Sequence, residues 1–382
     1  MVVGILGGGQ LARMLALAGL PLGLRFRSLD PSPEAVAGHV GELVVGAYDD
    51  PRALQQLVRD AQLVTFEFEN VPVAAVRWLQ DHVAVAPGPE ALAVGQDRVL
   101  EKQLFASLGM AVPAWQPAAS RAELLAAVRT VGTPCIVKTR RLGYDGRGQV
   151  RFAAGPILDS AIDAAWQELA ADAARGGLIV ESFVPFDREL SVLAARSRAG
   201  EVAIYPLVEN LHQGGILRRS RAPAPDVPPA IVATAHQFVR AVAERLDYTG
   251  VLAIELFLCG DRLLANEMAP RVHNSGHWTI EGSVCSQFEN HLRAVLGLPL
   301  GSTAMAGGGV ATMVNLIGAL PERDALLGLP GVHVHAYGKA SRAGRKLGHA
   351  TVVGADRVAV DALAARVGEL PAAPSGDWNF VG

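Results

Sequence analysis

Hydrophobic residues in the first ninety positions fall into short continuous runs, separated by stretches of helical periodicity. They predict strands at Val2–Leu6, Arg25–Asp30 and Leu63–Phe66 and helices at Gln10–Leu20 and Ala53–Asp60. Strands that alternate with helices in this way form parallel sheets. The N-terminal region is therefore expected to be an α/β domain that ends between Pro87 and Pro113.

The rest of the chain mixes strand and helix patterns less regularly. The expected strands are Pro134–Lys138, Leu178–Glu181, Glu189–Ala195, Val202–Leu207 and Val251–Phe257, and the expected helices are Ala122–Val131 and Ala230–Leu246. A linker followed by a strand is expected within Ala294–Pro321. The tail predicts strands at Val332–Tyr337 and Lys346–Val353 and a closing helix at Val358–Val367.

Composition excludes several classes of protein. The 382 residues carry a formal charge of −3 at pH 7, so a nucleic-acid-binding protein is not expected. The cysteines, Cys135, Cys259 and Cys285, show no CxxC spacing, which argues against a zinc site or disulfides and favours a reducing, cytoplasmic location. The N-terminus lacks the features of a signal peptide. Ala294–Pro321 is uncharged, but Pro299 and several glycines make a membrane-spanning helix unexpected.

The first candidate site is the glycine turn after the first predicted strand. Gly7, Gly9 and Ala12 give the pattern G-x-G-x-x-A, and Asp30 ends the next strand. This is the outline of a dinucleotide-binding turn, in which glycines let a phosphate approach a helix N-terminus. A nicotinamide or flavin site, a site for another phosphate and a plain strand-to-helix turn are all compatible with it.

The second candidate is the stretch IVKTRRLGYDGRGQV. Lys138 ends a predicted strand, and the glycines within 143–148 give a backbone whose amides are able to turn toward phosphate oxygens. No lysine follows the last glycine, so the stretch is not a P-loop. A simple hairpin turn between two strands is the alternative.

Two glutamates form the third candidate. If the segments 250–257 and 263–267 pair through a three-residue turn over 260–262, Glu255 lies directly opposite Glu267. Carboxylates so placed repel each other unless a cation lies between them. Magnesium takes one or two carboxylates and completes its shell with water and phosphate, so the pair suits a magnesium nucleotide. The alternative is an exposed hairpin with two solvated glutamates.

A dense polar run follows the second glutamate. It offers Arg271, His273, Asn274, Ser275 and His277 as donors with no acid nearby in the sequence to pair them, which suits an anionic intermediate. The two histidines lack a third ligand and an HExxH pattern, so zinc is the weaker interpretation. For His273 and Ser275 a structural role at the end of the sheet is the alternative.

Eight stretches occur in order along nearly the whole chain: GILGGGQLARM, TFEFENVP, QDRVLEK, IVKTRRLGYDGRGQ, ESFVPFDRELS, YPLVENLHQGGI, NEMAPRVHNSGHWTIEG and YGKASRAGRKLGH. Together they resemble the N5-carboxyaminoimidazole ribonucleotide synthase family of ATP-grasp enzymes in purine biosynthesis. The resemblance implies a homodimer with an α/β ATP-grasp architecture. Its implied parts are a Rossmann-like pre-ATP-grasp domain (1–95), an ATP-grasp lid (96–185), a catalytic domain (186–309) and a small β-rich C-terminal subdomain (310–382).

The resemblance also implies an ATP site between the lid and the catalytic domain, with magnesium on Glu255 and Glu267. The other residues implied at the nucleotide are Arg98, Lys138, Gly143, Tyr144, Asp145, Gly146, Arg147, Gly148, Gln149, Glu181, Ser182, Phe183, Val184, Glu189, His212 and Asn266. Residues 181–184 would read the adenine and Glu189 would hold the ribose. Many ATP-grasp enzymes carry an asparagine where this chain has Ala269, so the third protein ligand of the metal is left open.

The implied reaction consumes ATP, bicarbonate and 5-aminoimidazole ribonucleotide. Bicarbonate attacks the γ-phosphate to give carboxyphosphate, and the amine of the imidazole then takes the carboxylate. Arg271 would stabilise this intermediate, assisted by His273, Asn274 or His277. The ribonucleotide would contact Gln10, Leu11, Glu67, Glu69, Tyr144, Asp145, Arg147, Lys339, Arg345 and Lys346. An ATP-grasp ligase with another acceptor, or a nicotinamide-dependent oxidoreductase, is the alternative.

Overall fold

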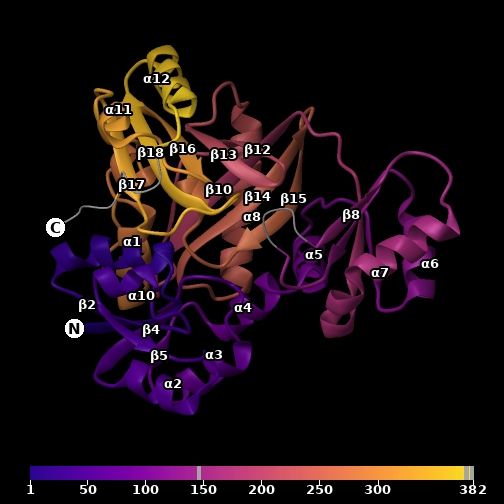
Figure 1. The fold of residues 1–382 in the computed structure, drawn as a ribbon, viewed down its shortest axis with the longest axis horizontal. Helices are drawn as coiled ribbons and strands as arrows, with labels where there is room; N and C mark the ends of the chain where they lie inside the picture. The colour runs from indigo at the N-terminus through magenta and orange to yellow at the C-terminus, as the bar shows by residue number, and fades with distance from the viewer. Residues whose placement is uncertain (144–147, 374–377, 379–382) are drawn as a thin grey trace.

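The computed structural model describes residues 1–143, 148–373 and 378. Within these residues the strands form three sheets. Figure 1 shows an N-terminal domain, a small domain set to one side, and a large sheet that continues into the C-terminal region. The α/β fold with a parallel N-terminal sheet is as predicted.

The N-terminal sheet is parallel throughout, with the strand order β3-β2-β1-β4-β5. Its elements are β1 (Val2–Leu6), α1 (Gln10–Gly19), β2 (Arg25–Asp30), β3 (Glu42–Val45), α2 (Pro51–Val58), β4 (Ala61–Phe66), α3 (Val73–Gln80) and β5 (Ala84–Val85). Val3 and Ile5 pack with α1, whereas Leu6 packs with α2 in a second core cluster. Helices thus bury both faces of the sheet, which explains the unbroken apolar run of β1.

The small domain is an antiparallel sheet with the order β6-β9-β7-β8. After the linking helices α4 (Pro89–Gly95) and α5 (Arg98–Ser107), its elements are β6 (Trp115–Ala118), α6 (Arg121–Val131), β7 (Cys135–Thr139), β8 (Gln149–Phe152), α7 (Asp159–Gly176) and β9 (Leu178–Ser182). Cys135 and Val137 join the core under α6 and α7. Because side chains alternate along a strand, Ile136 and Lys138 point the other way, into the cavity described below.

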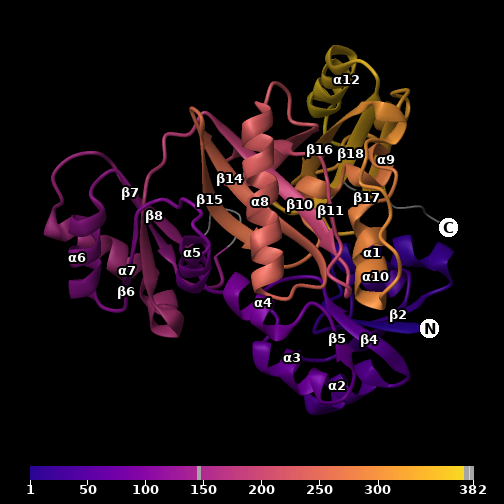
Figure 2. The ribbon, with the colours of Figure 1, turned by 180° about the vertical axis from the view of Figure 1, so that it is seen from behind.

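The large sheet has the order β15-β14-β10-β12-β13-β16-β18-β17, with β11 paired to β10. Its elements are β10 (Arg188–Arg196), β11 (Val202–Ile204), β12 (Val208–Gln213), β13 (Ile216–Ala222), α8 (Pro229–Arg245), β14 (Gly250–Cys259), β15 (Arg262–Ala269), α9 (Thr279–Gly282), α10 (Gln287–Leu296), β16 (Val310–Ile317), α11 (Arg323–Leu327), β17 (Val332–Ala336), β18 (Lys346–Gly354) and α12 (Arg357–Glu369). Figure 2 shows α8 across one face. The C-terminal strands extend this sheet through the pairing of β13 with β16.

Each predicted strand and helix overlaps an observed one. The expected strand at Val202–Leu207 is shorter than predicted and ends at Ile204, because Pro206 has no amide hydrogen with which to continue the pairing. The linker and strand expected within Ala294–Pro321 are present, after the end of α10. No helix in the described residues is long and apolar enough to cross a membrane. The domain boundaries at 95, 185 and 309 stay a prediction.

His291 of α10 joins the N-terminal domain to the large sheet. Its Nδ1 accepts the Val251 amide hydrogen at 3.1 Å, so Nε2 carries the ring proton and donates to Thr65 Oγ1 at 2.9 Å. Burial lowers the pKa of His291 from 6.5 to about 4. The neutral ring is therefore the form that the fold stabilises.

This histidine should make the fold sensitive to acid. Its contribution is complete above the unfolded pKa of 6.5 and is lost as the pH falls toward the folded pKa of about 4. Between about pH 7 and pH 5 the loss should be about 2 kcal/mol. In His291→Gln the amide keeps one acceptor and one donor but does not titrate, so its free energy of unfolding in urea should fall less over this range. Equal pH dependence in the two proteins would refute the assignment.

Candidate active site

A cavity of about 1250 Å³ lies where the three sheets meet. The predicted residues that line it are Gln10, Leu11, Glu67, Glu69, Arg98, Lys138, Gly143, Gln149, Glu181, Ser182, Phe183, Val184, Glu189, His212, Glu255, Asn266, Glu267, Arg271, His273, Asn274, His277, Lys339 and Lys346. Gly148 and Arg345 are not among the residues lining the cavity. Tyr144, Asp145, Gly146 and Arg147 lie outside the described residues.

The two glutamates face each other across the hairpin of β14 and β15. Glu255 pairs directly with Glu267, as predicted. The predicted three-residue turn is wrong: the turn is one residue shorter, because Gly260 takes a positive φ of 60° that permits a tighter turn. A bulge at Asn266 adds one residue before Glu267 and so restores the pairing. Lys102 Nζ supports this bulge by donating to the carbonyl of Asn266.

The electrostatics of this pair favour a cation. Burial, together with the charge of Glu267, raises the pKa of Glu255 to about 7. Within the described part of the chain, no group of three or more His, Cys, Asp or Glu side chains is arranged to hold a metal ion. Ala269 has no side-chain oxygen to add. Two carboxylates beside an open cavity fit magnesium, whose remaining ligands are commonly water and phosphate.

Lys138 and Lys102 flank the carboxylate of Glu181. Lys138 Nζ donates to Glu181 Oε2 at 2.8 Å, and Lys102 Nζ lies 3.8 Å from Oε1. Burial alone would raise the pKa of Glu181, but the two lysines lower it to about 2. Lys102 is not among the predicted residues, although it lies four positions after Arg98 and so on the same face of α5.

Arg98 connects α5 to the start of the glycine loop. Its guanidinium donates to the carbonyl oxygens of Thr139 and Gly143, at 3.1 and 3.0 Å. Strands β7 and β8 pair on either side of the loop, so the stretch does form a hairpin. The contact of the glycine loop with phosphate stays a prediction.

Glu189 and His212 lie on neighbouring strands of the large sheet. Glu189 is opposite Asn210, and His212 is two positions further along the same face of β12. His212 Nδ1 lies 2.7 Å from Glu189 Oε2. Burial lowers the pKa of His212, but the hydrogen bond to Glu189 and the charge of Glu255 raise it above its ordinary value. The pair lines the part of the cavity predicted to hold the ribose.

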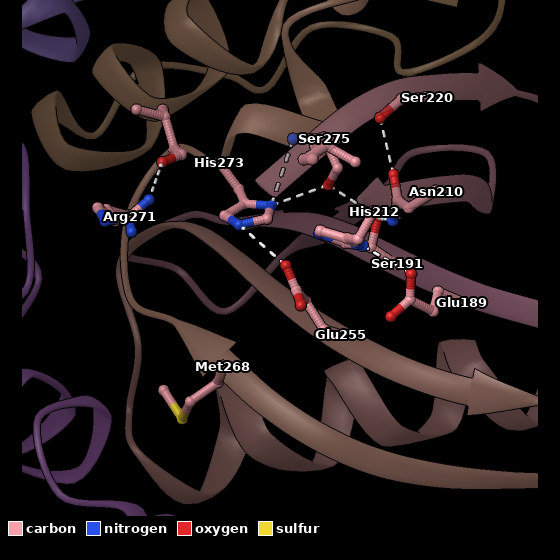
Figure 3. A network of polar contacts seen from close by, with 12 residues as sticks. Glu189, Ser191, Asn210, His212, Ser220, Glu255, Met268, Arg271, His273 and Ser275 are labelled. Atoms are coloured by element: carbon pink, nitrogen blue, oxygen red, sulfur yellow. Dashed lines mark hydrogen bonds and ion pairs between the residues drawn. The ribbon is translucent and has the colours of Figure 1, made fainter. Parts of the chain in front are cut away.

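Arg271 and His273 both have acidic partners, which corrects the expectation that this polar run lacks them. Arg271 Nε donates to Glu69 Oε2, and His273 Nε2 lies 3.2 Å from Glu255 Oε1. Figure 3 shows the contact of His273 with Glu255. Burial raises the pKa of Glu69, but Arg271 more than offsets this and lowers it. Nearby sequence does not reveal these partners because they come from other elements of the fold.

Asn274 and His277 complete the polar run. Both amide atoms of the Asn274 side chain are buried without a hydrogen-bond partner in the described residues, and the side chain lines the cavity. A buried amide at such a place is normally satisfied by a ligand or by water. His277 Nδ1 lies 3.1 Å from Gln287 Nε2, and burial keeps the pKa of His277 well below its ordinary value.

The glycine turn after β1 holds a carboxylate of the protein itself. Glu67 accepts amide hydrogens from Gly9, Leu11 and Ala12 at 2.6, 3.0 and 3.0 Å, at the N-terminus of α1. A Cβ at Gly9 would lie 2.4 Å from the Glu67 carboxylate. The helix N-terminus, which would otherwise attract a dinucleotide phosphate, is therefore already occupied. This geometry argues against the nicotinamide interpretation.

Lys339 and Lys346 bring positive charge to the same end of the cavity. Lys339 Nζ donates to Gln10 Oε1. Burial, aided by the nearby charges of Arg345 and Lys346, lowers the pKa of Lys339 to about 8. Arg345 itself donates to the carbonyl of Ala340 at 3.2 Å. The basic cluster predicted for the substrate phosphate is thus only partly directed into the cavity.

Family models match the chain in three consecutive parts. A ribonucleotide synthetase pre-ATP-grasp domain matches residues 1–96, an ATP-grasp domain matches residues 103–288, and a phosphoribosylaminoimidazole carboxylase C-terminal domain matches residues 311–363. The predicted ATP-grasp architecture is confirmed.

Individual relatives match over almost their whole length. The N5-carboxyaminoimidazole ribonucleotide synthase of Pseudomonas aeruginosa is 48% identical over 370 residues, which cover 97% of this chain and 99% of that protein. The crystal structure of the Thermus thermophilus synthetase has a TM-score of 0.90 at 51% identity and covers 99% of this chain and 100% of that one. The Aspergillus clavatus synthase, crystallised with ADP and 5-aminoimidazole ribonucleotide, has a TM-score of 0.86 at 30% identity, with coverage of 96% and 97%. The chain belongs to the N5-carboxyaminoimidazole ribonucleotide synthase family of ATP-grasp ligases.

Proposed function

We propose that this chain uses ATP and magnesium to carboxylate 5-aminoimidazole ribonucleotide with bicarbonate, by way of carboxyphosphate. The observation that carries the proposal is the direct pairing of Glu255 with Glu267 in a cavity that Lys138 and Arg271 also line. Glu255, Glu267 and Lys138 suit the magnesium complex of a triphosphate, and Arg271 suits an anionic intermediate. The choice of acceptor rests on the family, whose Aspergillus clavatus member was crystallised with this ribonucleotide.

In the first step a bicarbonate oxygen attacks the γ-phosphorus and ADP leaves. When bound to Glu255 and Glu267, magnesium would supply positive charge to the phosphate oxygens. Lys138 adds a second cation, and its bond to Glu181 keeps the ammonium at the end of β7. Phosphoryl transfer depends mainly on such positioning and charge neutralisation, so no covalent intermediate with the protein is needed.

In the second step the amine attacks the carboxyl carbon of carboxyphosphate. The phosphate leaves with the bonding electron pair, and the amine loses a proton. Arg271 is largely buried and charged, so its guanidinium is suited to stabilise the anion before and during this step. Asn274 offers an amide whose two polar atoms have no partner among the described residues. Burial keeps the pKa of His273 well below its ordinary value, so His273 acts as a neutral hydrogen-bonding group.

The phosphate of the ribonucleotide is assigned to the basic end of the cavity. Lys339 and Lys346 line that end, with Arg345 close enough to affect the pKa of Lys339. Gln10 lies within hydrogen-bond reach of Lys339, and Glu67 closes the glycine turn beside it. The imidazole would then extend from this end toward Arg271.

A homodimer that acts in the cytoplasm is part of the same proposal, because the family resemblance implies a dimer and the cysteine spacing favours a reducing compartment.

An ATPase assay tests the proposed function. With magnesium and bicarbonate present, ADP release should be slow without an acceptor and should rise by at least about tenfold with 5-aminoimidazole ribonucleotide, because the amine consumes the intermediate productively. Glycinamide ribonucleotide, which has the same ribose phosphate but another amine, serves as the matched control and should not stimulate. If glycinamide ribonucleotide alone stimulates ADP release, the proposed acceptor is wrong. If 5-aminoimidazole ribonucleotide stimulates ADP release without bicarbonate, the reaction is not a carboxylation.

A further inference from the structure

A line of buried hydrogen bonds runs across the large sheet to His273, as Figure 3 shows. Ser220 Oγ donates to Asn210 Oδ1 at 2.7 Å, and Asn210 Nδ2 donates to Ser191 Oγ at 2.9 Å. Ser191 Oγ then donates to Ser275 Oγ at 2.8 Å, and that hydroxyl lies 2.8 Å from His273 Nδ1. We call Ser220, Asn210, Ser191 and Ser275 the polar relay. All four side chains are buried.

The direction of these bonds determines which nitrogen of His273 carries the proton. Each hydroxyl of the polar relay has a single hydrogen, so Ser275, which accepts from Ser191, is left to donate to Nδ1. The backbone amide of Ser275 independently donates to the same Nδ1 at 3.4 Å. Both observations make Nδ1 an acceptor. The single proton of the neutral ring therefore sits on Nε2.

The Nε2 proton lies beside Glu255, one of the two glutamates proposed to bind magnesium. Nε2 is 3.2 Å from Glu255 Oε1, so the protonated nitrogen faces one oxygen of the carboxylate. The other tautomer would present a nitrogen lone pair to that oxygen, and the two would repel. Hydrogen bonds from the surrounding shell commonly fix the orientation of metal-binding carboxylates in this way.

We propose that the polar relay fixes the tautomer of His273 and thereby holds Glu255 in the orientation that binds the cation. Ser275 and Asn210 are positioning residues in this scheme, because they act on the metal site only through His273. The effect on magnesium rests on the proposed function, whereas the tautomer itself does not.

Two variants break the relay in different ways. Ser275→Ala removes the hydroxyl that donates to Nδ1. Asn210→Asp keeps the shape of the side chain, but an ionised aspartate only accepts. Ser191 must then donate to residue 210, Ser275 donates to Ser191, and Nδ1 receives no hydroxyl proton. Ser197→Ala is the matched control, since Ser197 is a buried serine whose hydroxyl accepts from the Glu201 amide in the turn after β10, outside the relay.

The first readout is ¹⁵N NMR of histidine-labelled protein without substrates, with the His273 signals assigned by their loss in His273→Gln. The unsubstituted protein and Ser197→Ala should show the proton on Nε2 alone. Ser275→Ala and Asn210→Asp should show an increased share of the Nδ1-protonated form, beside Nε2-protonated rings that the Ser275 amide and the Glu255 carboxylate still favour. Because no turnover is involved, this result stands even if the proposed function fails. An unchanged tautomer in both relay variants, each folded by circular dichroism, would overturn the proposal.

The second readout is the magnesium requirement of turnover. Ser275→Ala should need about ten- to hundredfold more magnesium for half-maximal rate, the usual effect of losing a group that supports a metal ligand. The KM for 5-aminoimidazole ribonucleotide should change less than about twofold, because the relay does not contact that substrate in this scheme. A changed tautomer with an unchanged magnesium requirement would overturn the link to the metal.

Discussion

Replacing Arg271 with alanine should lower kcat by about a thousandfold and change the KM for ATP by less than about twofold. The guanidinium is largely buried, lines the cavity and is paired with Glu69 of the N-terminal domain. It would meet the anion that forms between the two steps rather than ATP itself. An interaction made only with the intermediate and its transition states affects turnover and not binding.

The pairing of Arg271 with Glu69 complicates this substitution and suggests its control. Arg271→Ala leaves the partly buried Glu69 carboxylate without its partner, which itself costs stability. The double variant Arg271→Ala with Glu69→Gln removes that unpaired charge. Its melting temperature should recover toward that of the unsubstituted protein while kcat stays low. If kcat also recovers, or if ATP binding weakens as much as turnover, Arg271 does not stabilise the intermediate.

Glu267→Gln should lower turnover by about a thousandfold and raise the magnesium concentration for half-maximal rate by at least about tenfold. Glutamine keeps the shape of the side chain and one carbonyl oxygen but removes the charge that attracts the ion. Glu255→Gln should behave in the same way, since the two carboxylates are opposite each other. Steady-state rates measured across a magnesium titration provide the test.

Glu281→Gln is the matched control for these substitutions. Glu281 is a partly buried acid that pairs with His335 and is not among the residues lining the cavity, so its loss should leave the magnesium requirement unchanged. If Glu255→Gln and Glu267→Gln also keep the ordinary magnesium dependence, the ion is held elsewhere. The assignment of the metal pair would then be wrong.

The sequence predicts the elements whose hydrophobic pattern is simple. β1 is an unbroken apolar run and β14 is mostly apolar because other elements cover them. β13 escapes prediction because its sequence, ILRRSRA, places arginines in a strand. One of these arginines, Arg221, forms ion pairs with Glu209 and Asp361 on neighbouring elements. Those partners are distant in sequence, so only the tertiary structure explains why this arginine is tolerated.

The candidate site shows the same limit. The predicted opposition of Glu255 and Glu267 is correct because two deviations from the predicted hairpin, the shorter turn and the bulge at Asn266, cancel each other. The shorter turn and the compensating bulge at Asn266 are not local, since the bulge is supported by Lys102 from α5. Glu67 accepts hydrogen bonds from the glycine turn only because β4, which it follows, pairs with β1, which precedes the turn. Motif spacing therefore identifies the glutamate pair, whereas its supporting contacts appear only in the fold.

The central claim is that bicarbonate is phosphorylated before the amine is carboxylated. Turnover with ¹⁸O-labelled bicarbonate, ATP and 5-aminoimidazole ribonucleotide tests it most directly, by mass spectrometry of the released phosphate. The bond formed between bicarbonate oxygen and phosphorus survives the second step, so each inorganic phosphate should carry one oxygen from bicarbonate. Unlabelled phosphate, released while the carboxylated product forms, would contradict the account.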